Sequence, residues 1–250
     1  MCVCCYATLL LAGLSLAAQE PGRPAESTVN AYILEKEAVL GDQIAAEVHR
    51  HTTAIENSSI AGYVNRLGRR ISAQMPEAKF PFTFGVVGDD PCPATHEPVA
   101  VPGGYVFVPA PLFIEAHDEA EFASMLAHSM EHVAQRHATR EASRGQIANR
   151  ASIPLIFTGS GACPEAISLP VGFLAMHRND ELEADALAVL TTARAGFDPE
   201  ALARYIGRTQ TQPTEVLSLL PSRDQRVNGK ENGNGKRKWG KRKWGNGDGR

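Results

Sequence analysis

Positive charge is scarce in this sequence outside its C-terminal end. The 250 residues carry a net charge of −3 at pH 7. Segment 228–250 contributes +6, with eight Lys or Arg and two Asp or Glu, so residues 1–227 carry −9. DNA and RNA binding rests on Lys and Arg side chains that neutralise phosphates. We therefore expect no nucleic acid partner for the body of the protein.

Tryptophan is absent before residue 239. Both tryptophans lie in two tandem copies of KRKWG, at 236–240 and 241–245, among Asn and Gly. Basic residues interleaved with aromatics can bind RNA or an anionic surface, which leaves peripheral association with a membrane open. Gly- and Asn-rich duplications are more often disordered appendages. We predict a disordered tail at 228–250 and one folded domain at 18–227.

The N-terminal apolar segment is too short to span a bilayer. The first eighteen residues, MCVCCYATLLLAGLSLAA, are uncharged, and Gly13 and Ser15 interrupt a stretch that falls short of the roughly 20 residues required. Small residues at Ser15 and Ala17 are typical of a signal peptidase site, although a basic residue near the start is missing. We predict a signal peptide at 1–17 and an exported protein, periplasmic or secreted, without a membrane span. The alternative is an uncleaved anchor.

Cysteine is rare after this leader. Cys2, Cys4 and Cys5 would leave with the signal peptide, so Cys92 and Cys163 alone remain. In an oxidising compartment these two could form a disulfide, but the sequence gives no distance between them. Their spacing matches no metal-binding motif.

Hydrophobic periodicity predicts an α+β fold that is mainly helical with a small β-sheet. The apolar segment 151–176 is broken by Pro and Gly, and we expect it to form short buried segments or a cover over a site. The expected elements are helices at 29–56 and 59–75, a strand at 80–87, a hairpin of 99–101 with 105–108 around Pro102-Gly103-Gly104, a long helix capped by Asp118 that runs past His137, a helix at 179–194 and another from Asp198.

Two histidines on the long helix indicate a metal site. At about 100° per residue, His128 and His132 project only about 40° apart, so both imidazoles can reach one ion. Such a pair can also simply line a polar helix face. Glu181 and Asp185 share the same spacing on the later helix. One carboxylate can therefore bind the metal while the other orients a ligand histidine.

Other polar residues near these motifs are expected to have structural or solvated roles. Asp180 and Glu183 are interpreted as solvated charges, with Glu183 pointing away from the metal. His137 falls near 180° on the long helix, opposite the metal, and is predicted to be a hydrogen-bonded structural residue. His177 precedes the Glu181 helix and could approach the site.

Four segments carry a family resemblance. They are VPGGYVFV at 101–108, LAHSMEHVAQRHATR at 126–140, ELEAD at 181–185 and RAGFDP at 194–199. Over about residues 30–227 the chain resembles the zincin metallopeptidases of the CAAX prenyl protease and HtpX type, in their soluble exported branch. In that family an HExxH helix and the Glu of ExxxD hold the metal. The resemblance implies one Zn²⁺ bound by His128, His132 and Glu181, with Asp185 as the orienting carboxylate.

Ser129 stands where that family has the glutamate of HExxH. Glu131 instead makes the segment read as HxxEH, the inverted zincin motif. Ser129 and Glu131 lie about 80° to either side of the histidine bisector, with Ser129 on the packed side. Because the resemblance implies a forward helix, we expect Glu131 on the wrong flank of the metal, as a partly exposed charge. The alternative is that Glu131 is the catalytic base.

The segment LPSRDQRV at 220–227 resembles a family segment that usually begins with His. Leu220 replaces that His, while Arg226 is retained. Arg226 could steady an anionic transition state or pair with a core carboxylate.

Two functions remain open after this comparison. The first is an exported zinc endopeptidase that holds protein or peptide substrates by pairing with strand 105–108. The second is a zinc-binding pseudopeptidase that binds unfolded chains and cleaves them poorly. Loss of a general base costs about 10²–10⁴ in rate. With Ser129 at the base position, we predict a peptidase by descent with impaired turnover.

Overall fold

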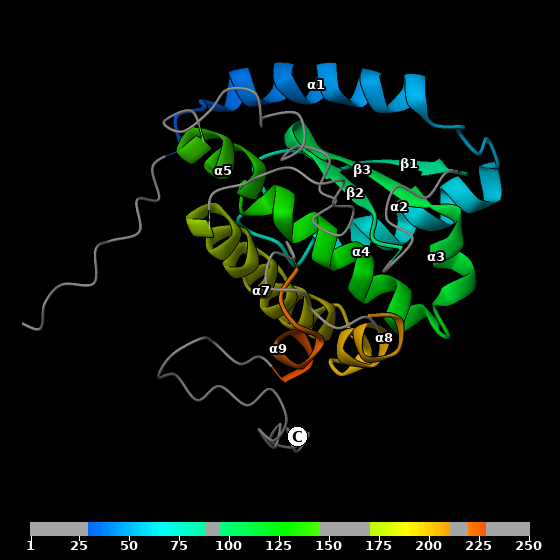
Figure 1. The fold of residues 1–250 in the computed structure, drawn as a ribbon. Coiled ribbons are helices and arrows are strands. Elements are labelled where there is room, and N and C mark those ends of the chain that lie inside the picture. The colour runs from blue at the N-terminus through cyan, green and yellow to red at the C-terminus, as the bar shows by residue number, and fades with distance from the viewer. Residues whose placement is uncertain (1–29, 89–95, 146–170, 211–219, 229–250) are drawn as a thin grey trace, which may run out of the picture.

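The structure is a computed structural model that describes residues 30–88, 96–145, 171–210 and 220–228. The predicted α+β class, mainly helical with a small sheet, is confirmed (Figure 1). The helices are α1 (Leu34–His51), α2 (Ser58–Ser72), α3 (Ala110–Glu115), α4 (Glu119–Ala134), α5 (His137–Gly145), α7 (Val171–Arg194), α8 (Ala201–Thr209) and α9 (Arg223–Asn228). The strands are β1 (Thr83–Val87), β2 (Val99–Val101) and β3 (Tyr105–Pro109), with a 3₁₀ turn, η1 (Pro102–Gly104).

Several expectations fall outside these residues. They concern the signal peptide at 1–17, the pairing of Cys92 with Cys163, most of segment 151–176 and nearly all of the basic tail. Among the helices that the structure describes, none combines the length and the apolar character needed to cross a membrane.

The three strands form one sheet in the order β1-β3-β2. β2 and β3 are antiparallel, as the hairpin prediction required, with Val99 opposite Phe107 and Val101 opposite Tyr105. The turn between them needs glycine, because Gly104 has φ +102° and a Cβ there would collide with the Pro81 carbonyl. β1 pairs with β3 in parallel. β3 is therefore the central strand, and the prediction that it pairs with substrate is wrong, because both of its edges are already used.

Helices cover both faces of this sheet. Val106 and Val108 of β3 face the main core, which α2, α4 and α8 complete, whereas Phe107 faces Ala45 of α1. Helix α1 lies across the sheet on the side away from α4 and α7 (Figure 1). Gly41 allows α1 to meet η1 closely, because a Cβ there would collide with the Pro102 carbonyl. The glycine that interrupts the apolar pattern of α1 is thus a packing position.

Helix α4 begins as predicted but ends earlier. The Asp118 side chain accepts a hydrogen bond from the Glu121 backbone N–H at 2.8 Å, which caps the helix. The expectation that this helix continues past His137 is wrong, because α4 ends at Ala134 and Arg136 has φ +58°. The Arg136 guanidinium binds the buried Glu37 carboxylate of α1, with Nε and Oε2 2.6 Å apart. A partner on α1 thus stabilises a backbone conformation that breaks the helix.

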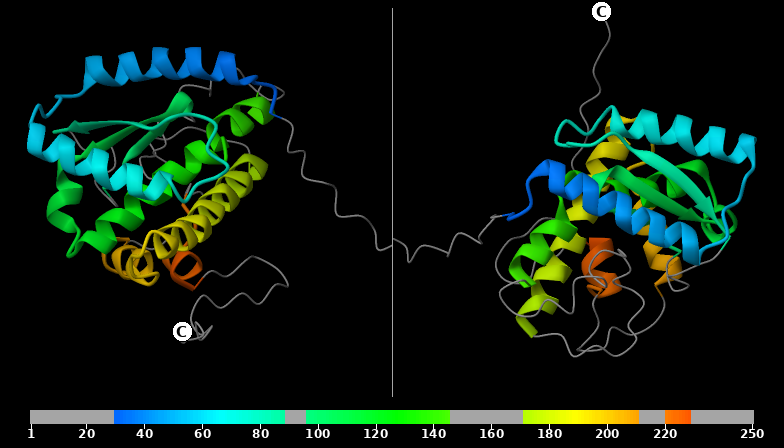
Figure 2. Two further views of the ribbon diagram at one scale, coloured as in Figure 1. Left: turned by 180° about the vertical axis from the view of Figure 1, so that it is seen from behind. Right: turned by 90° about the horizontal axis from the view of Figure 1, so that it is seen from above.

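Helix α7 lies beside α4 in each view (Figure 1, Figure 2). It begins at Val171, eight residues before the predicted start at 179, and it ends at Arg194 as predicted. Gly196 follows with φ +85°, the left-handed conformation that closes a helix at this position. The packing of α4 against α7 brings the two sequence motifs together.

Candidate metal centre

The structure brings His128, His132 and Glu181 into one cluster. The Nε2 atoms of His128 and His132 are 3.1 Å apart. The Glu181 carboxylate oxygens lie 3.4 Å from His132 Nε2 and 3.6 Å from His128 Nε2. Zinc bonds of about 2.0–2.2 Å would place tetrahedral ligand atoms roughly 3.3–3.6 Å apart. The two Glu181 distances end on different oxygens, Oε1 for His132 and Oε2 for His128, and each is close to the spacing of two zinc ligands.

The surroundings of Glu181 show that this cluster suits a cation. The side chain is buried, and its Oε2 atom has no hydrogen-bond partner among the described residues. Burial alone would raise the Glu181 pKa, but the neighbouring histidines, with His132 the largest contributor, hold it well below its ordinary value. A buried carboxylate oxygen is costly without a partner. A bound metal ion would provide that partner.

Asp185 and Arg226 support the first histidine from behind. Asp185 Oδ1 lies 3.0 Å from His128 Nδ1. Burial lowers the His128 pKa, but Asp185 and Glu181 outweigh it and raise this pKa to about 10. The buried Arg226 donates to both Asp185 oxygens at 2.8 and 2.9 Å, and to Glu97 at 2.9 Å. Of the two roles that the sequence left open for Arg226, the structure shows pairing with a core carboxylate.

Ser129 and Glu131 lie on different sides of α4. Ser129 lines the pocket beside the histidines, and its hydroxyl donates to the Pro98 carbonyl at 2.9 Å. Glu131 is absent from the described residues that line this pocket. Its carboxylate accepts a hydrogen bond from the Thr191 hydroxyl of α7 at 2.6 Å. The expectation of partial exposure for Glu131 is wrong, because Thr191 gives it a buried partner and its exposed fraction is only 3%.

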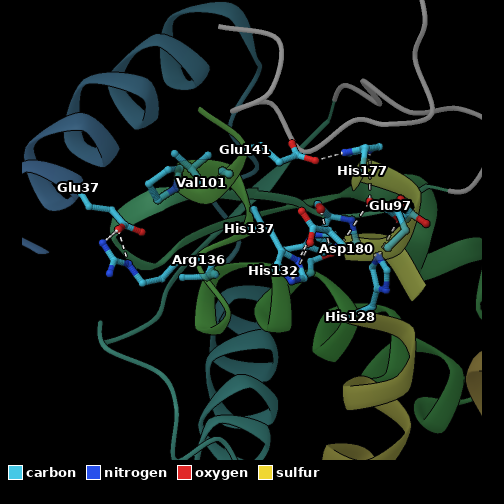
Figure 3. A pocket seen from close by; sticks show the side chains of 17 residues that line it. Glu37, Glu97, Val101, His128, His132, Arg136, His137, Glu141, His177 and Asp180 are labelled. Atoms are coloured by element: carbon cyan, nitrogen blue, oxygen red, sulfur yellow. Dashed lines mark hydrogen bonds and ion pairs between the residues drawn. The ribbon is translucent and has the colours of Figure 1, made fainter. Parts of the chain in front are cut away.

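His137 lies beside the second histidine, contrary to expectation. Its Nδ1 atom is 3.0 Å from His132 Nδ1, and its Nε2 atom is 3.1 Å from Glu183. The predicted position opposite the metal assumed one continuous helix, and the break at Arg136 turns His137 back toward α7. Figure 3 shows His132 and His137 close together at the pocket.

The two acidic residues interpreted as solvated charges are also engaged. Asp180 is buried, whereas Glu183 is exposed. Arg140 Nη2 donates to both carboxylates at 3.0 Å, and Glu183 also binds His137. The solvated interpretation is therefore wrong for Asp180, which is buried against Arg140 of α5. It is confirmed for the exposure of Glu183, although Glu183 also has partners that the sequence could not place.

His177 approaches the site from the first half of α7, as the sequence suggested. Its Nδ1 atom is 2.8 Å from Glu141, and its Nε2 atom is 3.6 Å from Glu181 (Figure 3). Burial lowers the His177 pKa, but Glu141 and Glu181 raise it to about 9. No sequence motif indicated Glu141 or Glu97, because each reaches the pocket only through tertiary packing. The acidic residues that line the pocket are Glu37, Glu97, Glu141, Asp180 and Glu181.

The ion pair of Glu183 predicts a specific response to acid. Hydrogen bonds from His137 and Arg140 lower the Glu183 pKa from 4.5 to about 2 in the folded protein. A depressed carboxyl pKa stabilises the fold above its unfolded-state value, and this contribution is lost as pH falls from about 4.5 to 2. We expect Glu183→Gln to flatten the decrease in melting temperature over that range. Parallel melting profiles for the variant and the wild type would contradict this.

Comparison with known proteins identifies the family. The model of peptidase family M48 matches residues 55–231. The chain belongs to peptidase family M48. M48 peptidases are zinc metalloproteases. This agrees with the predicted resemblance, and the cluster of His128, His132 and Glu181 lies within the matched M48 region.

Three curated relatives align with most of this M48 chain. A Vibrio cholerae protein is 30% identical over 91% of the chain and 50% of its own length. Proteins of Yersinia pestis and Escherichia coli K12 are 28% and 27% identical, over 80% and 82% of the chain and 44% and 45% of their own lengths. These last two are named beta-barrel assembly-enhancing protease. The chain spans about half the length of these curated relatives.

Proposed function

We propose that this protein is an exported zinc-dependent endopeptidase whose turnover is impaired by Ser129. The observation that supports the metal site is that His128, His132 and Glu181 bring their ligand atoms within 4.8 Å of one another, while the buried Oε2 atom of Glu181 has no hydrogen-bond partner among the described residues. Zinc bound there would polarise a peptide carbonyl and activate water. His128 and His132 would bind through Nε2, and Asp185 would keep the His128 ring oriented through its contact at Nδ1.

Strand β2 is the element that can hold an extended substrate. It forms an edge of the sheet, and its residues Ala100 and Val101 line the pocket with the histidines. Among the described strands β2 pairs with β3 alone, and a peptide that adds to such an edge gains backbone hydrogen bonds without sequence selectivity. Substrates of this class are unfolded or misassembled exported proteins, which fits the assembly-related name of two relatives.

The missing proton acceptor limits the reaction. The Ser129 hydroxyl already donates to the Pro98 carbonyl, and a neutral hydroxyl is a poor base. Glu131, the other candidate, is held by Thr191 outside the described pocket lining. This observation also favours the second candidate function, a zinc-binding pseudopeptidase that binds unfolded chains and rarely cleaves them. The two functions differ in whether the purified zinc protein cleaves casein above a metal-free control.

Metal content tests the site itself. We expect about one zinc per chain in the purified protein, and loss of that zinc in His128→Ala and Glu181→Ala, because each removes one of three protein ligands. Glu47→Ala on the exposed side of α1 is the matched control and should retain zinc. Metal analysis after dialysis measures this. Equal zinc retention in Glu181→Ala and the control would contradict the proposed ligand set.

A further inference from the structure

We propose that His137 and Glu183 form a hydrogen-bond relay that orients the zinc ligand His132. The inference rests on the proposed zinc site and extends it to residues outside the ligand set. His132 turns Nε2 toward His128 and Glu181, and Nδ1 toward His137. When Nε2 binds a metal, the proton of the neutral ring resides on Nδ1 and needs an acceptor.

With a metal on His132 Nε2, only one arrangement of protons satisfies both contacts of His137. His132 Nδ1–H donates to His137 Nδ1 over 3.0 Å, so the His137 proton must reside on Nε2. That Nε2–H donates to the Glu183 carboxylate over 3.1 Å. The relay thus fixes the tautomer of both rings and ends on an ionised acid.

The burial of His137 protects the contact that supports His132. The His137 side chain is 3% exposed, so water cannot readily replace it as the acceptor. Glu183 stays in position because Arg140 donates to it at 3.0 Å. The two ligand histidines therefore use different supports. His128 meets a carboxylate directly at Asp185, whereas His132 reaches its carboxylate through a second imidazole.

A second metal ion is the competing explanation for the same residues. The donor atoms of His137, Asp180 and Glu183 lie within 4.8 Å of one another, as a metal site would require. Arg140 Nη2, however, lies 3.0 Å from a carboxylate oxygen of both Asp180 and Glu183. The guanidinium already offsets part of the charge of these two acids and lies between them, so a divalent cation beside it would be repelled. We therefore assign the cluster to hydrogen bonding.

Zinc affinity measured by chelator competition tests the relay without relying on activity. His137→Leu removes the acceptor, and we expect its zinc dissociation constant to rise about 10–100-fold. His137→Asn can place an amide oxygen where Nδ1 stood, and we expect it to recover most of the affinity. The exposed His51–Glu47 pair of α1 provides the matched control, His51→Leu, which should bind zinc like the wild type.

Each result decides for or against the relay. Unchanged zinc affinity in His137→Leu would overturn the relay. Equal losses of affinity in His137→Leu and His137→Asn would also overturn it, because such losses would report changed packing and not a lost hydrogen-bond acceptor. If His137→Leu does not fold, the zinc affinity of Glu183→Gln tests the relay instead. We expect this variant to bind zinc several-fold more weakly than the wild type, and an affinity equal to that of the wild type would overturn the relay. Two zinc ions per wild-type chain, one of them lost in Glu183→Gln, would show a second metal site instead. A wild type that binds no zinc would refute the proposed function and this inference together, whereas the other outcomes leave the zinc site standing.

Discussion

Ser129→Glu is expected to raise peptide hydrolysis by about 10²-fold or more. The proposed zinc ligands and the carboxylate behind His128 are all in place, so the missing part is a proton acceptor beside the metal. General-base catalysis contributes about 10²–10⁴ in rate. Ser129 lines the pocket, and a carboxylate introduced there starts from the correct side of α4. Casein turnover of equally zinc-loaded proteins measures the effect.

Glu131→Gln is the control for this experiment. A glutamine can still accept the hydrogen bond from Thr191, so the fold should tolerate the change, and we expect little effect on turnover. A new carboxylate at position 129 that misses the pocket would be a buried charge costing several kcal/mol. Thermal melting and zinc content must therefore match between variants. An active wild type that loses activity in Glu131→Gln and gains none in Ser129→Glu would show that Glu131 is the base.

The sequence predicted well those elements that a few adjacent residues mark. Pro102-Gly103-Gly104 predicted the hairpin, since Gly103 and Gly104 adopt positive φ angles that other residues avoid. Asp118 and Gly196 marked a helix start and a helix end for similar reasons. The spacing of four residues placed His128 and His132 on one face of α4, as found. These features depend on a few adjacent residues, so they can be predicted without the rest of the fold.

The surroundings of the metal site were harder to predict because they depend on distant partners. The break at Arg136 has no Pro or Gly to mark it, and it is held by Glu37, 99 positions earlier in the chain. Without that break, helical arithmetic placed His137 on the wrong side. Glu131 was likewise expected to be partly exposed. The sequence could not reveal that its partner, Thr191, packs against it from α7. Angular arithmetic within one helix cannot supply a partner from another helix.

Arg226→Leu is expected to be the most destabilising substitution near the site. Arg226 is completely buried and lies between two other buried groups, the carboxylates of Asp185 and Glu97. Removing one member of a buried ion pair costs about 3–5 kcal/mol, because the remaining charges lose their partner without regaining water. Here two carboxylates would be left close together. Burial would then raise the pKa of Asp185, which Arg226 now holds below its ordinary value.

Urea unfolding in the presence of a chelator measures this loss separately from zinc binding. Arg204→Leu is the matched control, since Arg204 pairs with Asp198 on the surface and exposed pairs contribute about 0.2–1 kcal/mol. The loss of unfolding free energy in Arg226→Lys should fall between those of Arg226→Leu and Arg204→Leu. Lysine keeps the positive charge but has no planar guanidinium to donate to both Asp185 and Glu97. Equal destabilisation by Arg226→Leu and Arg204→Leu would contradict the buried triad. If the triad holds, Arg226 acts on the metal site from behind Asp185, by fixing the acid that orients His128, rather than by contact with a substrate.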